Sequence, residues 1–468
     1  MLGKTRRIHF VGIGGVGMSG IAELLANLGY EVSGSDVKGS ELTVRLQQSV
    51  GVKVYEGHAE RNVGDADVVV VSSAVRPTNP EIAEAMRRGI PVIPRAEMLA
   101  ELMRMRFSIA VAGAHGKTTT TSMIAFVLAR GGLDPDAVIG GRLRAFGSNA
   151  RLGRGEYMVA EADESDRSFL MLWPSIAVIT NIDREHMESY GSFEELQQAF
   201  AEFANKVPFY GVVVACADDP HLVPVLPRFR RRLVTYGVTN PLANFAATEV
   251  EVGTFGGRCV VHRRREGAPE RLGTLEVTLP GRHNLQNAMA AVAVASQVGV
   301  PFDEIAGSLR VFEAPERRFE RYGEAGGVLV VDDYAHHPTE IAAVLAAART
   351  ALARRLIVAF QPHRYTRTQQ LMDEFGPALK EADEIVLADV YPAGEDPIAG
   401  VTVEALAASI QRTAPELPVR IARRIDDVVP EVLKAARAGD AVITLGAGSI
   451  GTLPKRLIEA LKRRETSN

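Results

Sequence analysis

Short apolar runs rich in β-branched residues alternate with alanine-rich stretches of helical periodicity along nearly the whole chain. The run FSIAVAG at 107–113, for example, is followed by the helical stretch TTTTSMIAFVLARGG at 118–132. Strands that alternate with helices in this way are typical of parallel sheets covered on both faces. The pattern therefore predicts an α/β fold. Only the shorter, alternating runs between residues 235 and 280 indicate a small antiparallel excursion.

The chain is too long, at 468 residues, for one ordinary hydrophobic core. Two breaks in the alternation suggest domain boundaries. One is a charged, methionine-rich helical stretch that ends near residues 103–107, and the other is the turn-prone EAPERR at 313–318. We therefore predict three α/β domains, at residues 1–106, 107–313 and 314–468.

Charge and cysteine content limit the classes of function. The formal net charge of −4 argues against a general nucleic-acid binder, because no basic excess can neutralise phosphates. The two cysteines, Cys216 and Cys259, lie far apart and suit a reducing compartment. The opening residues lack a signal-peptide core, and no apolar run reaches the ~20 residues that cross a bilayer. We expect a soluble cytoplasmic protein without membrane insertion.

The first glycine-rich motif, GIGGVG at 12–17, lies between a predicted strand and a predicted helix. Asp36 ends the next strand. Glycines at such a turn let backbone N–H groups approach a diphosphate, and the acid can reach a ribose hydroxyl. Taken alone the motif is an NAD fingerprint, and a tight turn without a ligand is the alternative. It indicates only a loop that can accept a diphosphate.

The second motif, AGAHGKTTT at 112–120, has the Gly-Lys-Thr of a P-loop. In a P-loop, backbone amides surround the phosphates, the lysine (here Lys117) reaches the β- and γ-phosphates, and the hydroxyl (here Thr118) binds Mg²⁺. The spacing departs from the strict motif, because Val111 stands where the first glycine would be. The strand–loop–helix context still predicts an ATP site. A hydride-transfer enzyme has no use for such a loop.

A magnesium site needs hard oxygen donors near the γ-phosphate. The strand YMVAEADES, beginning at Tyr157, ends with Glu161, Asp163 and Glu164, where the magnesium-binding acid of a P-loop protein is expected. His186 follows the next strand in a loop. These residues are expected at the carboxyl edge of the sheet, where ligands gather. Asn284 and Asn287 share one face at the start of an alanine-rich helix. They could be helix-capping residues or amides that grip adenine or phosphate, and the residues alone leave both readings open.

Polar and cationic side chains gather after consecutive strands of the last predicted domain. DDYAHHP at 332–338 follows one strand, QPHRYTR at 361–367 follows the next, and Arg318 precedes both. Because parallel strands end at one edge of a sheet, these residues predict the wall of an active site. Arg364 and Arg367 suit a carboxylate or a phosphate.

Ordered motifs along essentially the whole chain resemble the Mur ligases. They are AGAHGKTTTT, EADESD, TNIDREHMESY, GRHNLQNAMAA, PERRFE, DDYAHHPTE, FQPHRYTRT, DVYPAGEDP and GAGSIG. Within that family, GIGGVGMSGIA and the pair DDYAHHPTE and FQPHRYTRT resemble the branch that adds L-alanine most closely.

The resemblance implies three domains. The first, Rossmann-like, holds the UDP of UDP-N-acetylmuramate, the central P-loop domain holds ATP, and the last, Rossmann-like, receives L-alanine. The first glycine-rich loop would then bind UDP and not NAD. The implied reaction is ATP-dependent ligation of L-alanine to the UDP-sugar carboxylate through an acyl phosphate, the first amino-acid addition to a peptidoglycan precursor. The implied metal is Mg²⁺, or Mn²⁺ in its place, and the implied assembly is a monomer or homodimer.

The resemblance also assigns residues to roles. UDP-sugar binding falls to Gly14, Gly15, Val16, Gly17, Met18, Ser19, Asp36 and Ser73. ATP binding falls to Gly113, His115, Gly116, Lys117, Thr118, Thr119, Asn284, Asn287, Arg318 and Asp333. The metal ligands are Thr118, Glu161 and His186, and the amino-acid side comprises Tyr334, His336, Arg364 and Arg367. The catalytic set is Lys117, His186, Arg318 and His336, with His336 the candidate general base.

One feature departs from the wider family. Several sister ligases have a carbamylated lysine after the central-domain histidine, whereas this chain has Phe200, Ala201 and Glu202 there and no lysine before Lys206. The alanine-adding branch shares this lack, which leaves open what orders a second metal. The alternatives are a recycling ligase that attaches a ready-made peptide to the same UDP-sugar and, more distantly, a nicotinamide-dependent oxidoreductase. The P-loop, acids and histidine together weigh against a non-catalytic nucleotide sensor.

Overall fold

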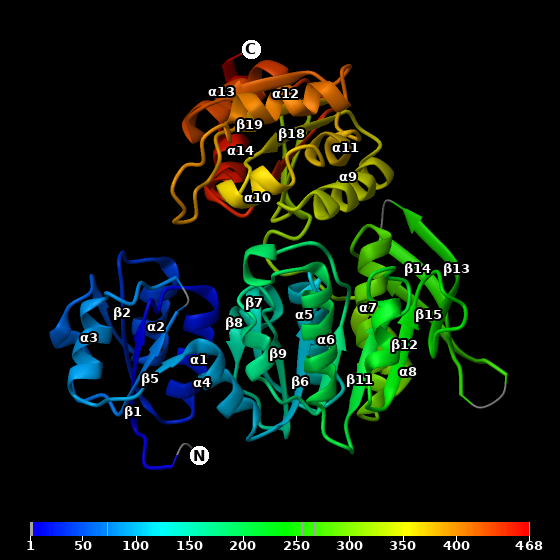
Figure 1. Ribbon diagram of the computed structural model, residues 1–468. Helices are drawn as coiled ribbons and strands as arrows, with labels where there is room; N and C mark the ends of the chain where they lie inside the picture. Colours follow the sequence, from blue (N-terminus) through cyan, green and yellow to red (C-terminus); the bar gives the residue numbers. More distant parts are fainter. Residues whose placement is uncertain (1–2, 73, 254–255, 266–267, 468) are drawn as a thin grey trace. The chain divides into compact units, whose positions relative to one another are not determined.

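A computed structural model describes residues 3–72, 74–253, 256–265 and 268–467 (Figure 1). Within these residues the strands form a five-stranded, a ten-stranded and a six-stranded sheet, most of whose pairings are parallel. The chain divides into two compact units. The first comprises Met1–Val250, Cys259–Glu276 and Gln286–Pro315, and the second comprises Glu251–Arg258, Val277–Leu285 and Glu316–Asn468. No helix of the described part is long and apolar enough to cross a bilayer.

The five-stranded sheet of the first unit has the order β3-β2-β1-β4-β5, and every pairing is parallel. Its strands are β1 (Arg7–Val11), β2 (Glu31–Asp36), β3 (Lys53–Glu56), β4 (Val68–Val71) and β5 (Val92–Pro94). Its helices are α1 (Val16–Asn27), α2 (Glu41–Val50), α3 (Pro80–Arg87) and α4 (Arg95–Met103), with the short helix η1 (Glu60–Val63). Because β2 and β4 flank β1, the first glycine-rich loop leaves the sheet where the strand order reverses, a usual ligand position.

The ten-stranded sheet has the order β15-β14-β13-β12-β11-β10-β6-β9-β7-β8. Its strands are β6 (Phe107–Ala112), β7 (Asp136–Leu143), β8 (Ser148–Arg151), β9 (Tyr157–Glu161), β10 (Ile176–Ile179), β11 (Val212–Cys216), β12 (Leu233–Gly237), β13 (Phe245–Gly253), β14 (Gly256–Arg263) and β15 (Glu270–Val277). The helices around it are α5 (Lys117–Arg130), α6 (Phe193–Asn205), α7 (Arg282–Gln297) and α8 (Phe302–Leu309), with η2 (Arg144–Phe146), η3 (Ser168–Met171), η4 (Met187–Ser189) and η5 (Val223–Arg228). The runs expected between 235 and 280 form the strands at one end of this sheet, and β6 lies near its middle.

The six-stranded sheet of the second unit has the order β16-β17-β21-β18-β19-β20. Its strands are β16 (Glu320–Ala325), β17 (Val328–Asp333), β18 (Leu356–Phe360), β19 (Glu384–Ala388), β20 (Val419–Ala422) and β21 (Ala441–Leu445). Its helices are α9 (Pro338–Leu352), α10 (Tyr365–Gln370), α11 (Phe375–Leu379), α12 (Val403–Thr413), α13 (Ile425–Ala435) and α14 (Leu453–Ser467), with η6 (Ser449–Thr452). Only the pairing of β16 with β17 is antiparallel among those described.

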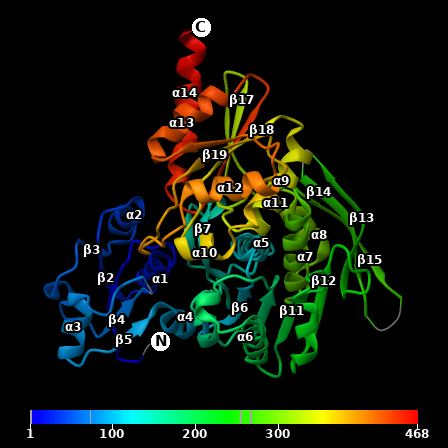
Figure 2. The ribbon, with the colours of Figure 1, turned by 45° about the horizontal axis from the view of Figure 1, so that its top comes forward.

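Both faces of this sheet are buried under helices. Val358 of β18 belongs to an apolar cluster with α9, α11 and α12, whereas its neighbour Ile357 belongs to a second cluster with α13 and α14. Neighbouring residues of a strand point to opposite faces, so the two clusters are the two sides of one sheet. Figure 2 shows α14, in red, beside β17 at the C-terminal end of the chain. The α/β class and the mostly parallel sheets are as the sequence predicts.

Candidate active site

The P-loop lies between β6 and α5, and its glycines are required by close neighbours. Gly113 has φ +138°, and a Cβ there would lie 2.0 Å from Thr180 Oγ1. Gly116 has φ +78°, and a Cβ there would lie 2.6 Å from Asn287 Oδ1. Side chains other than hydrogen are therefore excluded at both positions, by the backbone conformation and by the contacts. The loop is pressed between the end of β10 and the start of α7.

Side chains at the end of β10 hold the loop in this conformation. The backbone N–H of His115 donates to Asn181 Oδ1 at 2.8 Å, and Asn181 Nδ2 donates back to the His115 carbonyl at 3.0 Å. The Thr180 hydroxyl donates to the same carbonyl at 2.7 Å. These bonds fix the conformation of the loop. The backbone N–H groups at the start of α5 are therefore held in place, as phosphate binding requires. Asn181 was not among the predicted site residues, although it stands in the quoted motif TNIDREH.

Lys117, the first residue of α5, extends its ammonium group into a ring of oxygen atoms. Its Nζ donates to the Gly113 carbonyl at 2.7 Å, the Ala114 carbonyl at 3.0 Å and Glu164 Oε1 at 2.9 Å. Glu164 is 2% exposed. A lysine so placed is a fixed positive charge at the mouth of the P-loop.

Electrostatics keep this lysine charged. Burial alone would lower the pKa of Lys117, but the carboxylates of Glu164, Asp163 and then Glu185 raise it above its usual value. Burial raises the pKa of Glu164, against the opposing effect of Lys117. Asp163 has a lowered pKa: burial opposes this, but Lys117 and Ser165 outweigh it. A site with one cation and several acids is suited to bind more positive charge, such as a divalent metal ion.

Thr118 and Glu161, two of the predicted metal ligands, lie together. The Thr118 hydroxyl donates to Glu161 Oε2 at 2.9 Å, and the Gly140 backbone N–H donates to the same oxygen at 2.9 Å. Glu161 therefore stands at the end of β9 beside the first turn of α5. This is the arrangement of hydroxyl and acid that holds magnesium in P-loop proteins.

His186, the third predicted ligand, lies in a group with two other acids. One ligand atom from each of Glu164, Glu185 and His186 falls within 4.8 Å of the others. His186 has φ +57°, an uncommon conformation that sets its side chain at the turn before η4. Glu164 was one of the three acids expected at the metal site, and the resemblance assigned Glu161 among them. Glu185 was not a predicted ligand, although it stands in the quoted motif TNIDREHMESY. Because Lys117 contacts Glu164, this group adjoins the P-loop.

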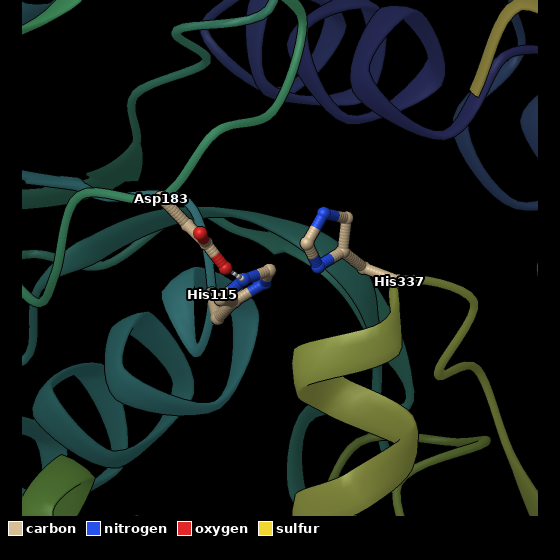
Figure 3. Close-up of side chains that lie close together, drawn as sticks. All are labelled: His115, Asp183 and His337. Carbon is tan, nitrogen blue, oxygen red and sulfur yellow. Dashed lines mark hydrogen bonds and ion pairs between the residues drawn. The ribbon is translucent and has the colours of Figure 1, made fainter. Parts of the chain in front are cut away.

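His115 projects from the P-loop toward the same acids. Its Nε2 lies 2.8 Å from Asp183 Oδ2, the interaction drawn dashed in Figure 3. An ionised carboxylate only accepts, so the histidine proton of this bond is on Nε2. Its Nδ1 lies 3.9 Å from Glu185 Oε2. The interaction orients the ring, and the loop gains a second link to the segment after β10.

The two predicted amides of α7 have different surroundings. Asn287 Oδ1 accepts from the Thr120 hydroxyl at 3.1 Å and lies against Gly116, so it belongs to the P-loop wall. Asn284 donates through Nδ2 to the Pro280 carbonyl at 2.8 Å, a local bond at the start of its own helix. Thr119 is buried in the first turn of α5. Of the two readings, the structure favours the site role for Asn287, and Asn284 makes at least the local bond.

The first glycine-rich loop is tied to the end of β2. The backbone N–H groups of Gly12 and Ile13 donate to the Ser35 carbonyl at 2.8 and 3.0 Å. The Gly14 N–H donates to Asp36 Oδ2 at 2.8 Å. The acid expected to reach a ribose thus also braces the loop itself. Gly15 caps α1 without a side chain of its own.

Beyond the loop, the start of α1 packs on β7 and β8 of the ten-stranded sheet. Asn149 Nδ2 donates to the Val16 carbonyl at 2.5 Å and to Ser19 Oγ at 3.3 Å. Met18 and Ser19 are buried, whereas the Val16 side chain is exposed. Because their side chains are buried, Met18 and Ser19 pack beneath the loop. The UDP-sugar contact predicted for them would therefore use their backbone atoms or neighbouring residues. Ser73, also predicted for this site, lies outside the described residues.

Arg95, which sequence reasoning missed, lies between the first glycine-rich loop and an acid that follows β9. A Cβ on Gly17 would lie 2.9 Å from Arg95 Nη1, and Arg95 Nη2 lies 3.6 Å from Asp163 Oδ2. Asp163 is one of the carboxylates that raise the pKa of Lys117, so this guanidinium stands between the first loop and the acids around Lys117. Its position at the start of α4, after a proline, carries no motif that would have singled it out.

In the second unit, Asp333 lies at the end of β17 and holds two backbone groups. The N–H groups of Phe319 and Ala335 donate to its carboxylate at 2.7 and 2.8 Å. Burial raises the pKa of Asp333 to about 6, although Arg318 opposes the change. The Arg318 guanidinium stands over the Tyr334 ring, 5.3 Å from its centroid. Arg318, Asp333 and Tyr334 are thus brought together as predicted.

Rings extend this group along the edge of the sheet. His336 packs edge-on against Tyr334 and His363 at centroid distances of 5.4 and 5.5 Å, and His363 stacks on Tyr391 at 5.5 Å. Arg367 Nη1 lies 3.3 Å from His363 Nδ1. His363 and Tyr391 stand in the motifs that predicted the wall of an active site, but neither was assigned a role of its own.

Arg364, the other arginine expected here, has φ +70° and faces Glu395 at 3.6 Å. Its backbone conformation is rare for a residue with a side chain, and such strain is common at functional sites.

Three family profiles match the chain in order. Residues 7–107 match "Mur ligase family, catalytic domain", residues 111–295 match "Mur ligase middle domain" and residues 317–448 match "Mur ligase, glutamate ligase domain". A UDP-N-acetylmuramate–L-alanine ligase of Geotalea daltonii is 53% identical over 462 residues, covering 99% of each chain.

Two solved structures extend the comparison. The UDP-N-acetylmuramate–alanine ligase of Thermotoga maritima has a TM-score of 0.82 and 28% identity, covering 99% of this chain and 100% of that one. A murein peptide ligase of Psychrobacter arcticus has a TM-score of 0.74 and 26% identity, covering 98% and 99%. These matches confirm the predicted three-domain α/β fold. The chain belongs to the Mur ligase family.

Proposed function

We infer that this chain is an ATP-dependent ligase that joins L-alanine to the carboxylate of UDP-N-acetylmuramate, the first amino-acid addition to a peptidoglycan precursor. The observation that carries the chemistry is Lys117, held at the mouth of the P-loop among buried acids. The specificity follows from full-length relatives of 50–53% identity that are UDP-N-acetylmuramate–L-alanine ligases.

The reaction must first overcome the poor electrophilicity of a carboxylate. A carboxylate oxygen attacks the γ-phosphorus of ATP, the bond to ADP breaks, and an acyl phosphate forms. Lys117 neutralises the charge that develops on the transferring group. Arg95 lies between Gly17 of the first loop and Asp163, so we assign it to orient the substrate carboxylate or the acyl phosphate.

The metal-binding part of the proposal rests on the donor atoms. Thr118 and Glu161 offer hard oxygens beside the P-loop, and Glu164, Glu185 and His186 offer a mixed carboxylate and imidazole group. This chemistry fits Mg²⁺, and the imidazole also fits Mn²⁺. A bound divalent ion would neutralise charge on the β- and γ-phosphates. Thr118 and Glu161 would hold one ion, and His186 with its two acids would hold a second.

In the second step the neutral amine of L-alanine attacks the acyl carbon, phosphate leaves, and the amine gives up a proton. We assign proton removal to His336, whose ring is fixed by Tyr334 and His363. Arg367 and Arg364 are the cations available to the amino-acid carboxylate. Arg318 and Asp333 are assigned to the nucleotide side.

The remaining assignments follow the same proposal. Residues 1–106 bind the UDP-sugar, residues 107–313 bind ATP, and residues 314–468 bind the amino acid. Because ATP and a UDP-sugar are its substrates, we place the enzyme in the cytoplasm. We expect a monomer or homodimer, which light scattering after gel filtration would distinguish.

Two alternatives are not favoured. Peptide-recycling ligases are represented by two solved structures at 26% and 30% identity, against 50–53% for the full-length alanine ligases. Their TM-scores of 0.74 and 0.60 also fall below the 0.82 of the alanine-ligase structure. A nicotinamide-dependent oxidoreductase would leave the P-loop and its acids without a role.

The test is ADP release by the purified protein with Mg²⁺ and ATP, adding UDP-N-acetylmuramate and L-alanine singly and together. We expect ADP only when both are present, with an alanyl product detected by mass. Turnover with a tripeptide but not with L-alanine would assign the chain to recycling instead. No ADP with any combination would contradict the proposal.

A further inference from the structure

Three loops on the amino-terminal edge of the ten-stranded sheet bring aromatic and basic side chains together. The loops precede β10, β11 and β12, which pair in parallel with Ile176 opposite Val212 and Val213 opposite Leu233. We name this surface the aromatic–basic edge. It comprises Trp173, Lys206, Phe209, Tyr210, Arg228, Arg230, Arg231 and Arg232. It lies at the end of the strands opposite to the P-loop, so the proposed active site does not use it.

The aromatic side chains of this edge are largely in solvent. Phe209 is 89% exposed, Tyr210 is 63% exposed and Trp173 is 61% exposed. Phe209 and Tyr210 pack edge to face at a centroid distance of 5.3 Å, so they form one apolar projection. Burial of such rings is favourable, and in the isolated protein they remain in water. Clustered exposed apolar groups mark interaction surfaces more often than single ones do.

The arginine-rich loop before β12 is bound to the end of α6. Asn205 accepts the Arg230 N–H at 2.7 Å through Oδ1 and donates to the Arg228 carbonyl at 3.1 Å through Nδ2. The Arg231 guanidinium donates to the Asn205 carbonyl at 3.3 Å. The next residue, Lys206, stands over the Trp173 ring with Nζ 5.0 Å from the centroid. Arg228, Arg230, Arg231 and Arg232 are all exposed.

A pocket of about 500 Å³ continues the positive charge beyond Arg232. Its lining includes Arg232, Arg263, Arg264, Arg265 and Gln297. Two of these arginines have partners, because Arg232 donates to Gln297 at 2.9 Å and Arg263 pairs with Glu270 at 2.6 Å. The Arg264 Nε is buried and makes no hydrogen bond within the described residues. The pocket is therefore suited to a phosphate group, and it shares Arg232 with the aromatic–basic edge.

We propose that the aromatic–basic edge docks on a membrane surface rich in anionic phospholipid. Exposed Trp, Tyr and Phe rings favour the headgroup region, and neighbouring Arg and Lys are attracted to lipid phosphates. The three loops precede neighbouring parallel strands and so lie along one edge of the sheet, and a lipid surface needs no shape-matched partner. A single-stranded nucleic acid would need a basic channel that follows its backbone, with aromatic rings on which successive bases stack. The protein lies on the bilayer and does not span it.

Docking at this edge leaves the P-loop facing away from the bilayer, because the two lie at opposite ends of the same strands. The product of the proposed reaction would then be released near the membrane. The inference goes beyond the proposed function and does not depend on it, since binding to vesicles is measured without turnover.

The chain has a single tryptophan, and it is Trp173, so its fluorescence reports on this edge alone. The full-length protein is mixed with vesicles of phosphatidylcholine, or of phosphatidylcholine with phosphatidylglycerol, at low salt. We expect flotation with the anionic vesicles only, a blue shift of the emission, and quenching by lipids brominated on the acyl chain. High salt should release the protein, because the attraction is partly ionic.

Two variants and a matched control make the test decisive. Arg230→Glu with Arg231→Glu should weaken the partition into anionic vesicles by about tenfold or more, since each cation near such a surface contributes about 1 kcal/mol. Phe209→Ser with Tyr210→Ser should abolish the blue shift. Arg423→Glu with Arg424→Glu makes the same charge change at exposed arginines of the second unit and should bind as the parent does. All three should keep ligase activity in solution.

Failure to float with anionic vesicles at low salt would overturn the proposal. So would equal binding by the Arg230→Glu, Arg231→Glu variant and its control. Binding of single-stranded RNA, lost in that variant and without vesicle binding, would assign the edge to nucleic acid instead.

Discussion

The two glycine-rich loops of the first unit follow the same local plan and have opposite chemical surroundings. In each, a buried strand leads into a glycine turn and a helix (Figure 1). In the first loop, backbone N–H groups donate to Ser35 and Asp36, and the loop has no lysine. The second places Lys117 among Glu161, Asp163, Glu164 and Glu185. A diphosphate can bind to either plan, but only the second has charges arranged to stabilise a transferring phosphoryl group.

The loops also differ in what supports them. The second is held by neutral side chains of β10, Thr180 and Asn181. The first rests on a buried charge, because Ser35 beneath it donates to Glu81 at 2.5 Å, and Glu81 is fully buried with His9 at 3.1 Å. The first loop is therefore supported by the buried carboxylate of Glu81, whereas the charged residues of the second loop, Lys117 and the acids around it, lie at the site itself.

The strongest way to break the comparison is to remove the cation of the second loop. Lys117→Met keeps the length of the side chain, and we expect kcat to fall about a thousandfold or more, because the charge stabilises the transferring phosphoryl group. ADP release with all substrates present measures it. Lys206→Met is the control, a lysine of the same unit outside the loop, and should stay within about twofold. A Lys117→Met enzyme with about a tenth of the parent rate would contradict the assigned role.

The second change tests the metal assignment. Glu161→Gln keeps an oxygen that can accept from Thr118 and Gly140 but removes the charge. We expect the half-saturating Mg²⁺ concentration to rise about 10–100-fold, with an unchanged melting temperature. Glu194→Gln, an exposed acid at the start of α6, is the control. An unaltered Mg²⁺ titration would remove Glu161 from the metal site.

The third change concerns the first loop, where we expect an effect on binding alone. Asp36→Ala deletes the acceptor of the Gly14 N–H, and we expect KM for UDP-N-acetylmuramate to rise about tenfold with kcat within about twofold. Asp36→Asn keeps an acceptor oxygen, so its KM for UDP-N-acetylmuramate should lie between the values of Asp36→Ala and the parent. If kcat of Asp36→Ala fell by as much as KM rose, the first loop would contribute to the chemical step as well as to binding.

The smallest effect on activity is expected from the charge under the first loop. Burial opposes ionisation of Glu81, but hydrogen bonds from His9, Ser35 and Asn62 lower its pKa to about 2 from 4.5. A lowered acid pKa stabilises the fold above pH 4.5, and this contribution is lost as the pH falls toward 2. At about 1.4 kcal/mol for each unit of the shift, its full value is about 3 kcal/mol.

Urea unfolding of Glu81→Gln should show this loss. The variant should unfold at lower urea than the parent at pH 7, and the gap should narrow below pH 4.5, where the parent loses the same contribution. Glu84→Gln, on the same helix and paired at the surface with Arg87, should have little effect at either pH. A gap that stays constant with pH would mean that the ionised carboxylate is not what stabilises the domain.

Local patterns were sufficient for the parts of the site that lie close in sequence. The glycine turns, Lys117 and Thr118 follow from one strand–loop–helix motif, and Glu161 beside Thr118 follows from the rule that parallel strands end at one edge. The nicotinamide reading of the first loop shows the limit of such patterns. A glycine turn with a following acid specifies backbone geometry, and backbone geometry is shared by many nucleotides.

Partners that come from distant segments could not be read from the chain. Arg95 meets Gly17 and Asp163, although nothing in its own neighbourhood marks it. The motifs that contain His336, His363 and Tyr391 do not show that His363 lies between the other two rings. Asp36 also illustrates this, because its bond to Gly14 gives it a bracing role that no motif indicates.

By itself, the sequence determined the α/β alternation, the two phosphate-compatible loops and the family, because each depends on periodicity or on residues a few positions apart. Only the tertiary structure decided which acids surround Lys117, which buried charge supports the first loop and which loops meet at the aromatic–basic edge. The physical reason is that strand order and register set these neighbours, and a hydrophobic pattern specifies that strands will pair without specifying with which.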